Sequence, residues 1–387
     1  MVEEIDFKDI QPYSDSEFKA RMAELVEEPG FEHAVRFVMP DVNFPEFVEK
    51  LKKITYNDTF QREMMLPFLQ LLVSKTTDGV TIGGLENLEC GKSYTFMSNH
   101  RDIVLDASFL NYGFLINNLP TSEVAIGNNL LIFDWITDLV KLNKSFIVKR
   151  DVKMTKALEA AKQLSAYIHY DINERHQSVW IAQREGRAKD SNDRTQESLV
   201  KMLALAGGGT IVENLQSIDI VPVSITYEYD PNDHLKAREF LLKKLDPEFR
   251  KSQHDDLLSM ETGLLQHKGR VHFEIGRCIN EDLSNLSSED KIEVVRRVCN
   301  LIDRHIHLGY KIYPINYIAY DLLHSTDRFA DHYTTQEVED FKAYLERKLD
   351  MVRLENVPEE DRSYMREMML VMYSNPLKNK LEAAGNN

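Results

Sequence analysis

Strand-like and helical segments alternate along the middle of this chain of 387 residues, and the alternation limits the folds that it can adopt. Short apolar runs bounded by glycine or polar residues predict strands, whereas the longer stretches between them repeat apolar residues at helical spacing. The predicted strands are GVTIGGLENL, KSYTFMSN, SEVAIG, KSFIVKR, SVWIAQ, DIVPVSITYEY and RVHFEIGRCI. Strands that alternate with helices of this length form right-handed β-α-β units. We therefore predict an α/β fold with a mostly parallel central sheet flanked by helices.

Both ends of the chain are predicted to be helical. Charged and apolar residues alternate at helical spacing over residues 1–76, and the same pattern returns from Asp290 onward. A charged helical insertion follows Asp230 and precedes the last predicted strand. The predicted organisation is an N-terminal helical region over 1–78, an α/β domain over 79–280 and a C-terminal helical region over 281–387.

Composition excludes several classes of protein. The net charge of −16 argues against general nucleic-acid binding, which needs a basic face. Cys90, Cys278 and Cys299 are widely spaced, and His305 and His307 have no cluster of further ligands beside them, so we expect no metal, no cofactor and no disulfide. The acidic N-terminus does not resemble a secretory signal, and no stretch approaches the roughly 20 apolar residues of a membrane span. We expect a cytoplasmic protein, with contact to the inner face of the membrane left open.

Polar residues follow directly after three of the predicted strands. In an open parallel sheet, ligands bind at the carboxyl ends of the strands, where these residues are expected to lie. They are Asn99, His100, Arg101 and Asp102 after KSYTFMS, Lys149 and Arg150 after KSFIV, and Arg184, Glu185, Gly186, Arg187 and Lys189 after SVWIAQ. A histidine base beside several cations suits a substrate with a phosphate and a hydroxyl to be deprotonated.

Four sequence blocks, NHRDIVLD, FIVKR, REGRAK and IVPVSITYE, occur in the order and approximate spacing of the motifs of the glycerolphosphate acyltransferase family. The stretch 79–280 resembles that family, and its layout is closest to the branch that acts on glycerol-3-phosphate or dihydroxyacetone phosphate. Two details differ. Five residues separate His100 from Asp106, where the His-x4-Asp motif has four. The third block is one residue shorter, and Arg184 stands where the family has proline.

The resemblance implies an acyl transfer in phospholipid synthesis, from acyl-CoA or acyl carrier protein to a hydroxyl of a glycerolphosphate-type acceptor. His100 would be the general base. Asp106 is the preferred carboxylate to orient it, and Asp102, which also suits a helix N-cap, is the other candidate. Backbone N–H groups at the helix start after His100 would stabilise the oxyanion, because a helix N-terminus has unpaired donors.

The resemblance also implies which residues bind the acceptor. The planar fork of arginine suits bidentate phosphate contacts, so Arg150 and Arg187 would hold the phosphate, and whether Arg187 or Lys189 faces it stays open. The other residues assigned to substrate binding are Asn99, Arg101, Lys149, Glu185, Gly186, Lys189 and Pro222, the last as one wall of the site.

Two other functions stay open. A lysolipid acceptor, either lysophosphatidate or a lyso-aminolipid, shares the chemistry but not the head group. A catalytically inactive scaffold that binds acyl chains is compatible with the altered spacing of the first and third blocks. The basic segment KLNKSFIVKRDVK suits acyl carrier protein or an anionic membrane surface as a partner. The apolar segments FLNYGFLINN and LLIFDWITDLV are predicted to be core rather than an acyl tunnel.

Overall fold

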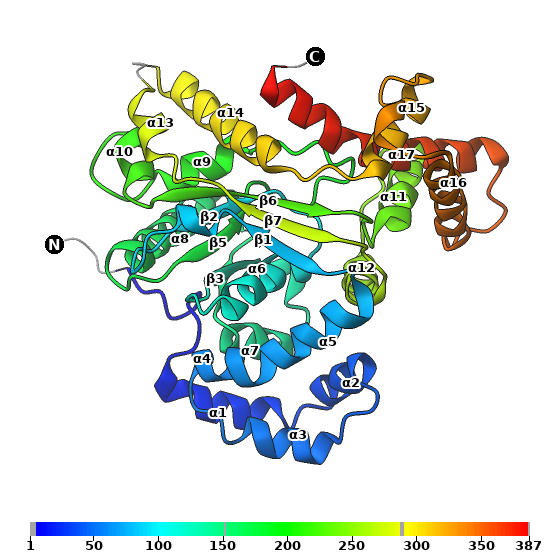
Figure 1. Cartoon of the computed structure of the whole chain (residues 1–387). Coiled ribbons are helices and arrows are strands. Elements are labelled where there is room, and N and C mark those ends of the chain that lie inside the picture. The colour runs from blue at the N-terminus through cyan, green and yellow to red at the C-terminus, as the bar shows by residue number, and fades with distance from the viewer. Residues whose placement is uncertain (1–4, 151, 287–289, 386–387) are drawn as a thin grey trace.

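A computed structural model of the chain describes residues 5–150, 152–286 and 290–385. It confirms the predicted α/β class, because the strands form one central sheet with helices on both faces (Figure 1). Each predicted strand segment contains one observed strand. The strands are β1 (Val80–Gly83), β2 (Thr95–Ser98), β3 (Glu123–Gly127), β4 (Ser145–Val148), β5 (Val179–Ala182), β6 (Ile220–Tyr227) and β7 (Val271–Ile275).

The order of strands in the sheet is β1-β7-β6-β2-β5-β3-β4, and five of them run in one direction. The pairs β2·β5, β2·β6, β3·β5 and β3·β4 are all parallel. In contrast, β7 is antiparallel to β6, with Tyr227 opposite Val271, and β1 is parallel to β7. The carboxyl ends of β2 to β6 therefore share one edge, while β1 and β7 end at the other.

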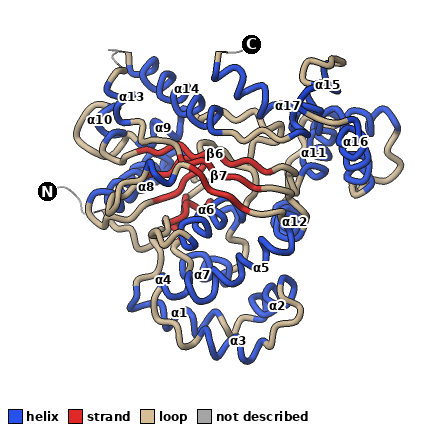
Figure 2. Tube along the Cα trace, in the orientation of Figure 1, coloured by secondary structure: helices blue, strands red, loops and turns tan. Residues whose placement is uncertain are grey.

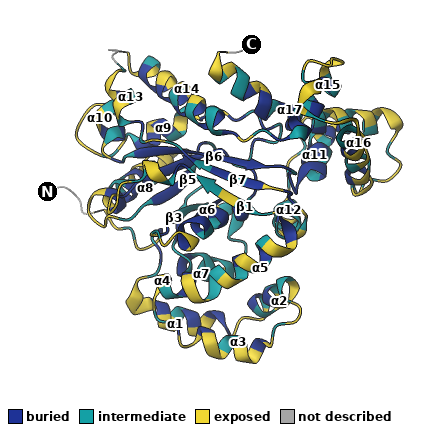
Figure 3. Cartoon of the chain, in the orientation of Figure 1, coloured by how far each residue is buried: buried dark blue, intermediate teal, exposed yellow. Residues whose placement is uncertain are grey.

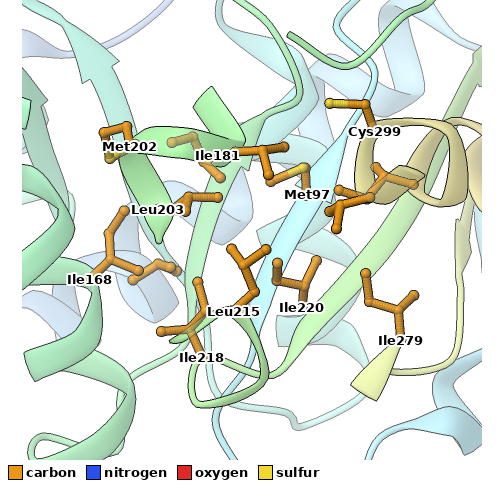
Figure 4. Packing of buried hydrophobic residues seen from close by; sticks show 14 of the residues in the cluster. Met97, Ile168, Ile181, Met202, Leu203, Leu215, Ile218, Ile220, Ile279 and Cys299 are labelled. Atoms are coloured by element: carbon orange, nitrogen blue, oxygen red, sulfur yellow. The ribbon is translucent and has the colours of Figure 1, made fainter. Parts of the chain in front are cut away.

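Helices cover both faces of the sheet, as the tube in Figure 2 shows. Side chains alternate along each strand, so Phe96, Trp180 and Val221 join one core cluster while Met97, Ile181 and Ile220 join another. The first cluster contains residues of α5 (Leu66–Thr76) and α6 (Leu105–Ile116). The second, drawn in Figure 4, contains residues of α8 (Met154–Asn173), α9 (Glu197–Leu203), α10 (Ile211–Gln216), α13 (Asn280–Ser284) and α14 (Lys291–Gly309).

The N-terminal helices form a separate layer beyond α5 and α7 (Asp134–Leu142) (Figure 1). They are α1 (Asp15–Leu25), α2 (Pro29–Val38), α3 (Phe44–Leu51) and α4 (Asn57–Phe60), followed by a turn of π-helix over Gln61–Met65. Proline in the first turn of α2 and of α3 suits a helix start, where its missing N–H costs nothing. Their buried faces form one cluster that also includes Leu142, so this layer packs on the α/β part through α7.

The C-terminal helices pack with part of the insertion that follows β6. One cluster joins α11 (Asp233–Leu245) with α15 (Pro314–His324), α16 (Thr335–Asp350) and α17 (Glu359–Ala384). The other insertion helix, α12 (Gln253–Leu265), lies beside α5. The sheet at the centre of these layers is the most deeply buried part, while α1, α3 and α16 expose much of their surface (Figure 3). The domain boundaries at 78 and 280 stay predictions.

The structure differs from the predicted elements in one respect that bears on the site. The longer stretch between the predicted strands SEVAIG and KSFIVKR, which its apolar spacing predicts to be helical, is helical only in part: Asn128–Leu130 form a 3-10 turn and α7 begins only at Asp134. The intervening Leu131 and Phe133 line a cavity instead of completing a helix. None of the described helices is both long and apolar enough to cross a membrane.

Candidate active site

His100 and Asp106 form a hydrogen-bonded pair at the carboxyl edge of the sheet. Nδ1 of His100 lies 2.8 Å from Oδ2 of Asp106, and their side chains are 14% and 1% exposed. His100 follows β2 by two residues, and Asp106 lies in the first turn of α6, which brings the two together across a short loop. With its Nδ1–H donated to the carboxylate, the imidazole presents an unprotonated Nε2, as a general base requires.

The other carboxylate of this loop has a different task. Oδ1 of Asp102 accepts hydrogen bonds from the N–H groups of Val104 at 2.9 Å and Leu105 at 2.8 Å, which caps the start of α6. Burial, followed by the negative charge of Asp106, raises the pKa of Asp102. Of the two candidates for orienting His100, the structure therefore places Asp106 beside the ring and Asp102 at the helix cap.

The same hydrogen bonds bear on the expected oxyanion site. Oδ2 of Asp106 accepts from the N–H groups of Arg101 at 2.6 Å and Asp102 at 3.1 Å, and Asp102 takes those of Val104 and Leu105. Four of the N–H groups at this helix start are therefore occupied by carboxylates, whereas that of Ile103 is bound by neither Asp102 nor Asp106 in the described chain. An oxyanion site at this helix start stays a prediction.

Asn99 and Trp180 fix the strand end on which His100 stands. Asn99 is fully buried, donates from Nδ2 to the carbonyl of Ile225 at 2.9 Å and accepts from its N–H at 2.8 Å. Its amide thus extends the pairing of β2 with β6 and is not directed at a substrate, contrary to the prediction. Trp180 packs edge-on against the His100 ring, with 5.9 Å between centroids, and its Nε1–H donates to Ser98.

Arg101, predicted to touch substrate, is instead part of a buried ion pair. Its guanidinium contacts both carboxylate oxygens of Asp193, at 2.8 and 2.6 Å, and Tyr310 donates to the same carboxylate. Burial disfavours the charged guanidinium, but the negative charge of Asp193 raises the pKa of Arg101 overall. Arg101 is 4% exposed and its guanidinium is paired with Asp193. It therefore holds the loop in place and does not bind a ligand.

A cavity of about 1790 Å³ opens beside His100, and most of its lining is apolar. It extends from Ile103 along α6, where Ala107 and Leu115 line it, and continues to α5 and to the N-terminal helices α2 and α3. Parts of the segments FLNYGFLINN and LLIFDWITDLV therefore line a cavity, where only core was predicted. The cavity is larger than the roughly 300–1,000 Å³ typical of a pocket for one small ligand.

Four cations line the same cavity as His100. Lys149, Arg150 and Arg184 follow strands of the sheet, whereas Lys50 lies on α3 and pairs with Glu46. The backbones of β2 and β4 lie three strand spacings apart, roughly 14 Å, so Lys149 and Arg150 begin far from the base. The Arg150 side chain bridges part of this distance, because it passes over Gly127 of β3 and places Nη1 3.5 Å from Glu185 after β5. Lys149 pairs with Asp9 and donates to Gln163, so it is directed away from β5.

The other predicted phosphate ligands lie outside this cavity. Arg187 borders a small separate pocket with Lys236 and Lys251. Lys189 pairs with Glu239 of α11, and burial lowers the pKa of Lys189 to about 8. Neither Arg187 nor Lys189 is among the described residues that line the large cavity. The cavity therefore does not decide which of the two faces the phosphate. Gly186 has a left-handed φ of +68°, which turns the loop after Glu185 and takes Arg187 away.

Pro222 lies in the middle of β6, opposite Met97 of β2. It is buried, and its carbonyl accepts from the N–H of Gly276. Because β6 continues for five residues beyond it, Pro222 is not at the carboxyl edge. Pro222 is therefore part of the sheet and does not form the wall of the site that was predicted.

Two residues that were not predicted as site residues line the cavity next to His100. Arg184 lies two residues after the end of β5, the strand beside β2, and within the described chain no carboxylate lies at ion-pair distance from it. The position of Arg184 just after a predicted strand could have identified it as a site residue. No sequence pattern could have identified Trp180, because a tryptophan inside a predicted strand is normally core. Within the described residues, no group of three or more His, Cys, Asp or Glu side chains is placed to hold a metal ion.

Comparison with known proteins finds similarity to solved structures, but not to family models or curated sequences. No protein-family model matches the chain, and no curated protein sequence matches it. Four chains among the solved structures match. One is the crystal structure of the 1-acyl-sn-glycerophosphate (LPA) acyltransferase, PlsC, from Thermotoga maritima, with a TM-score of 0.39 and 14% sequence identity, over 74% of this chain and 96% of that chain. A likeness at this level does not say which residues act.

Proposed function

We propose that this protein is an O-acyltransferase that moves a fatty acyl group from a thioester, acyl-CoA or acyl carrier protein, to a hydroxyl of a glycerolphosphate-type acceptor. The observation that carries the proposal is the opening of the His100–Asp106 pair onto a large apolar cavity that Arg150 and Arg184 also line. A base, an apolar volume and the positive charge of Arg184, which has no ion-pair partner within the described chain, are the three features that a hydroxyl, an acyl chain and a phosphate require.

In the proposed reaction, Nε2 of His100 takes the proton of the acceptor hydroxyl, and the hydroxyl oxygen attacks the carbonyl carbon of the thioester. Asp106 keeps the proton on Nδ1 and stabilises the imidazolium that forms. When the tetrahedral intermediate collapses, the carbon–sulfur bond breaks and His100 returns its proton to the leaving sulfur. The products are an ester and a free thiol, and no covalent acyl-enzyme is needed.

Acyl transfer is tested directly with the purified protein. Labelled acyl-CoA and acyl carrier protein are each offered with glycerol-3-phosphate, dihydroxyacetone phosphate and lysophosphatidate, and the acylated product is measured. Transfer to one of these acceptors supports the proposal and names the acceptor. Absence of product from every pair, with an acyl chain still bound to the protein, would instead favour the inactive scaffold.

Removal of the Arg184 guanidinium is expected to weaken binding of the acceptor's phosphate. Because a hydrogen bond to a charged group is worth about 1.5–3 kcal/mol, Arg184→Ala should raise KM for glycerol-3-phosphate about tenfold or more, with kcat changed far less. Initial rates over a range of acceptor concentrations measure this. The matched control is Arg277→Ala, an exposed arginine outside the cavity lining, for which KM should not change. An unchanged KM in Arg184→Ala would remove this residue from the site.

A lysolipid is a second candidate acceptor. The observation that favours it is that the cavity has apolar walls on both faces of the sheet. The first part, which we call the α6 lobe, is lined by Ala107, Trp180 and Ala182 from the core cluster beside α6. The second, the α8 lobe, is lined by Ala161, Leu164, Ile181, Leu199 and Met202 from the opposite cluster (Figure 4 labels two of them). An acceptor with its own acyl chain would occupy one lobe while the donor chain occupies the other.

The two lobes can be filled separately with Ala107→Phe and Ala161→Phe. If the acceptor carries a chain, one of these variants should raise KM for lysophosphatidate about tenfold, because several methylenes lose their burial at ~0.8 kcal/mol each. KM for glycerol-3-phosphate, which has no chain, should stay within about twofold in the same variant. Equal effects on both acceptors in both variants would exclude a second acyl chain.

A further inference from the structure

The carboxylate of Asp106 uses its two oxygens very unequally. Oδ2 accepts hydrogen bonds from the His100 ring and from the N–H groups of Arg101 and Asp102. Oδ1 is fully buried and has no hydrogen-bond partner among the described residues. A buried carboxylate oxygen without a donor is costly, and in native proteins such atoms usually have a partner. This orphan acceptor therefore suggests that a donor is close by.

Tyr227 supplies a donor of the right kind. It is the last residue of β6 and 6% exposed, and its hydroxyl is also buried without a partner in the described chain. Its ring belongs to the same core cluster as Leu105 and Ala107, the neighbours of Asp106 on either side in α6. An orphan donor and an orphan acceptor thus lie within one packed region.

The electrostatics of Tyr227 agree with this placement. Burial, and after it the charge of Asp106, raise the pKa of Tyr227 well above its usual value of 10. Asp102 and Asp230 contribute in the same direction. The hydroxyl therefore keeps its proton over the whole working pH range and always has a hydrogen to donate.

We propose that Tyr227 is a positioning residue for the catalytic pair, whose hydroxyl donates a hydrogen bond to Oδ1 of Asp106, directly or through one water. With both oxygens held, the carboxylate cannot rotate away from Nδ1 of His100. Sharing the negative charge with Tyr227 also limits how strongly Asp106 attracts the imidazolium. The consequence for catalysis rests on the proposed acyl transfer, whereas the hydrogen bond itself does not.

Tyr227→Phe removes the hydroxyl and keeps the ring. We expect kcat to fall about tenfold with KM unchanged, because the lost hydrogen bond involves a charged group. The acid limb of the kcat/KM profile should move to higher pH, since the unshared carboxylate attracts a proton to the pair more strongly. The matched control is Tyr313→Phe. Tyr313 also has a buried hydroxyl without a partner in the described chain, its ring is covered by the guanidinium of Arg270, and it lies outside the cavity lining. Tyr313→Phe should leave kcat and the acid limb unchanged.

Two further measurements separate this proposal from the proposed function. In an Asp106→Asn background, Tyr227→Phe should cause no further loss of kcat, because its partner is already changed. The second measurement needs no activity: NMR titration of 13C-labelled histidine, with His100 identified by comparison with His100→Gln. A higher titration midpoint for His100 in Tyr227→Phe and not in Tyr313→Phe supports the proposal, even if no acyl transfer is found. An unmoved midpoint in an active enzyme overturns it while acyl transfer stands.

Discussion

Replacing His100 by glutamine is expected to lower kcat for acyl transfer by about 10³-fold, within the ~10²–10⁴-fold range of general-base catalysis. Glutamine fills a similar volume and can still hydrogen-bond to Asp106, but it cannot accept and return a proton. KM for donor and acceptor should change little, because neither the apolar lining nor the cations are altered. Steady-state rates of wild type and His100→Gln, measured with the same acceptor, give the result.

The control for this experiment is a histidine in a similar environment that is remote from the cavity. His305 of α14 pairs with Asp282 at 3.1 Å, as His100 does with Asp106, and its side chain is equally 14% exposed. His305→Gln should therefore leave kcat unchanged. Full activity of a folded His100→Gln variant would show that another group removes the proton, and the proposed mechanism would be abandoned.

The second large effect concerns stability. Asp193→Ala leaves the buried guanidinium of Arg101 without its carboxylate, and breaking a buried ion pair in this way costs about 3–5 kcal/mol. We expect a decrease of that size in the free energy of unfolding, measured by urea titration followed by circular dichroism. Tyr310 would also lose its acceptor, which adds to the effect.

Two comparisons show whether the buried charge is the cause. The double variant Arg101→Met and Asp193→Leu removes both charges and should recover most of the lost stability, because apolar side chains of similar size replace the pair. Glu24→Ala removes an exposed partner of Arg21 and should change the free energy of unfolding by less than about 0.5 kcal/mol. A loss below about 1 kcal/mol in Asp193→Ala would show that Arg101 finds solvent or another partner.

The sheet was predictable from the sequence, because every strand carries a local signal of apolar residues between polar boundaries. The direction of β7 was not, since alternation of apolar and polar residues is the same in parallel and antiparallel strands. The late start of α7 was also missed. Leu131 and Phe133 fit a helical pattern by spacing, but they line a cavity that residues distant in the sequence complete.

For the candidate site residues, the position in the fold was predicted better than the contacts. That His100, Arg150 and the loop after β5 share one edge follows from the parallel order of their strands. The partner of Arg101 is 92 residues away in the sequence and that of Lys189 is 50 residues away, so no local sequence pattern could predict either ion pair. Arg101 and Lys189 are therefore held in ion pairs within the protein. Arg184, which stands where the resembling family has proline, has no such partner in the described chain.

The cavity has a consequence for the folded state itself. Its apolar walls belong to both core clusters of the sheet, so the core beside the site is incomplete where the cavity enters it. A ligand with an acyl chain would fill this gap and stand in for protein side chains. Ligand binding is then coupled to unfolding, because any molecule that binds the folded chain alone stabilises it in proportion to the logarithm of its concentration over Kd. If the proposed function holds, the acyl chain of the substrate would thus be a temporary part of the hydrophobic core.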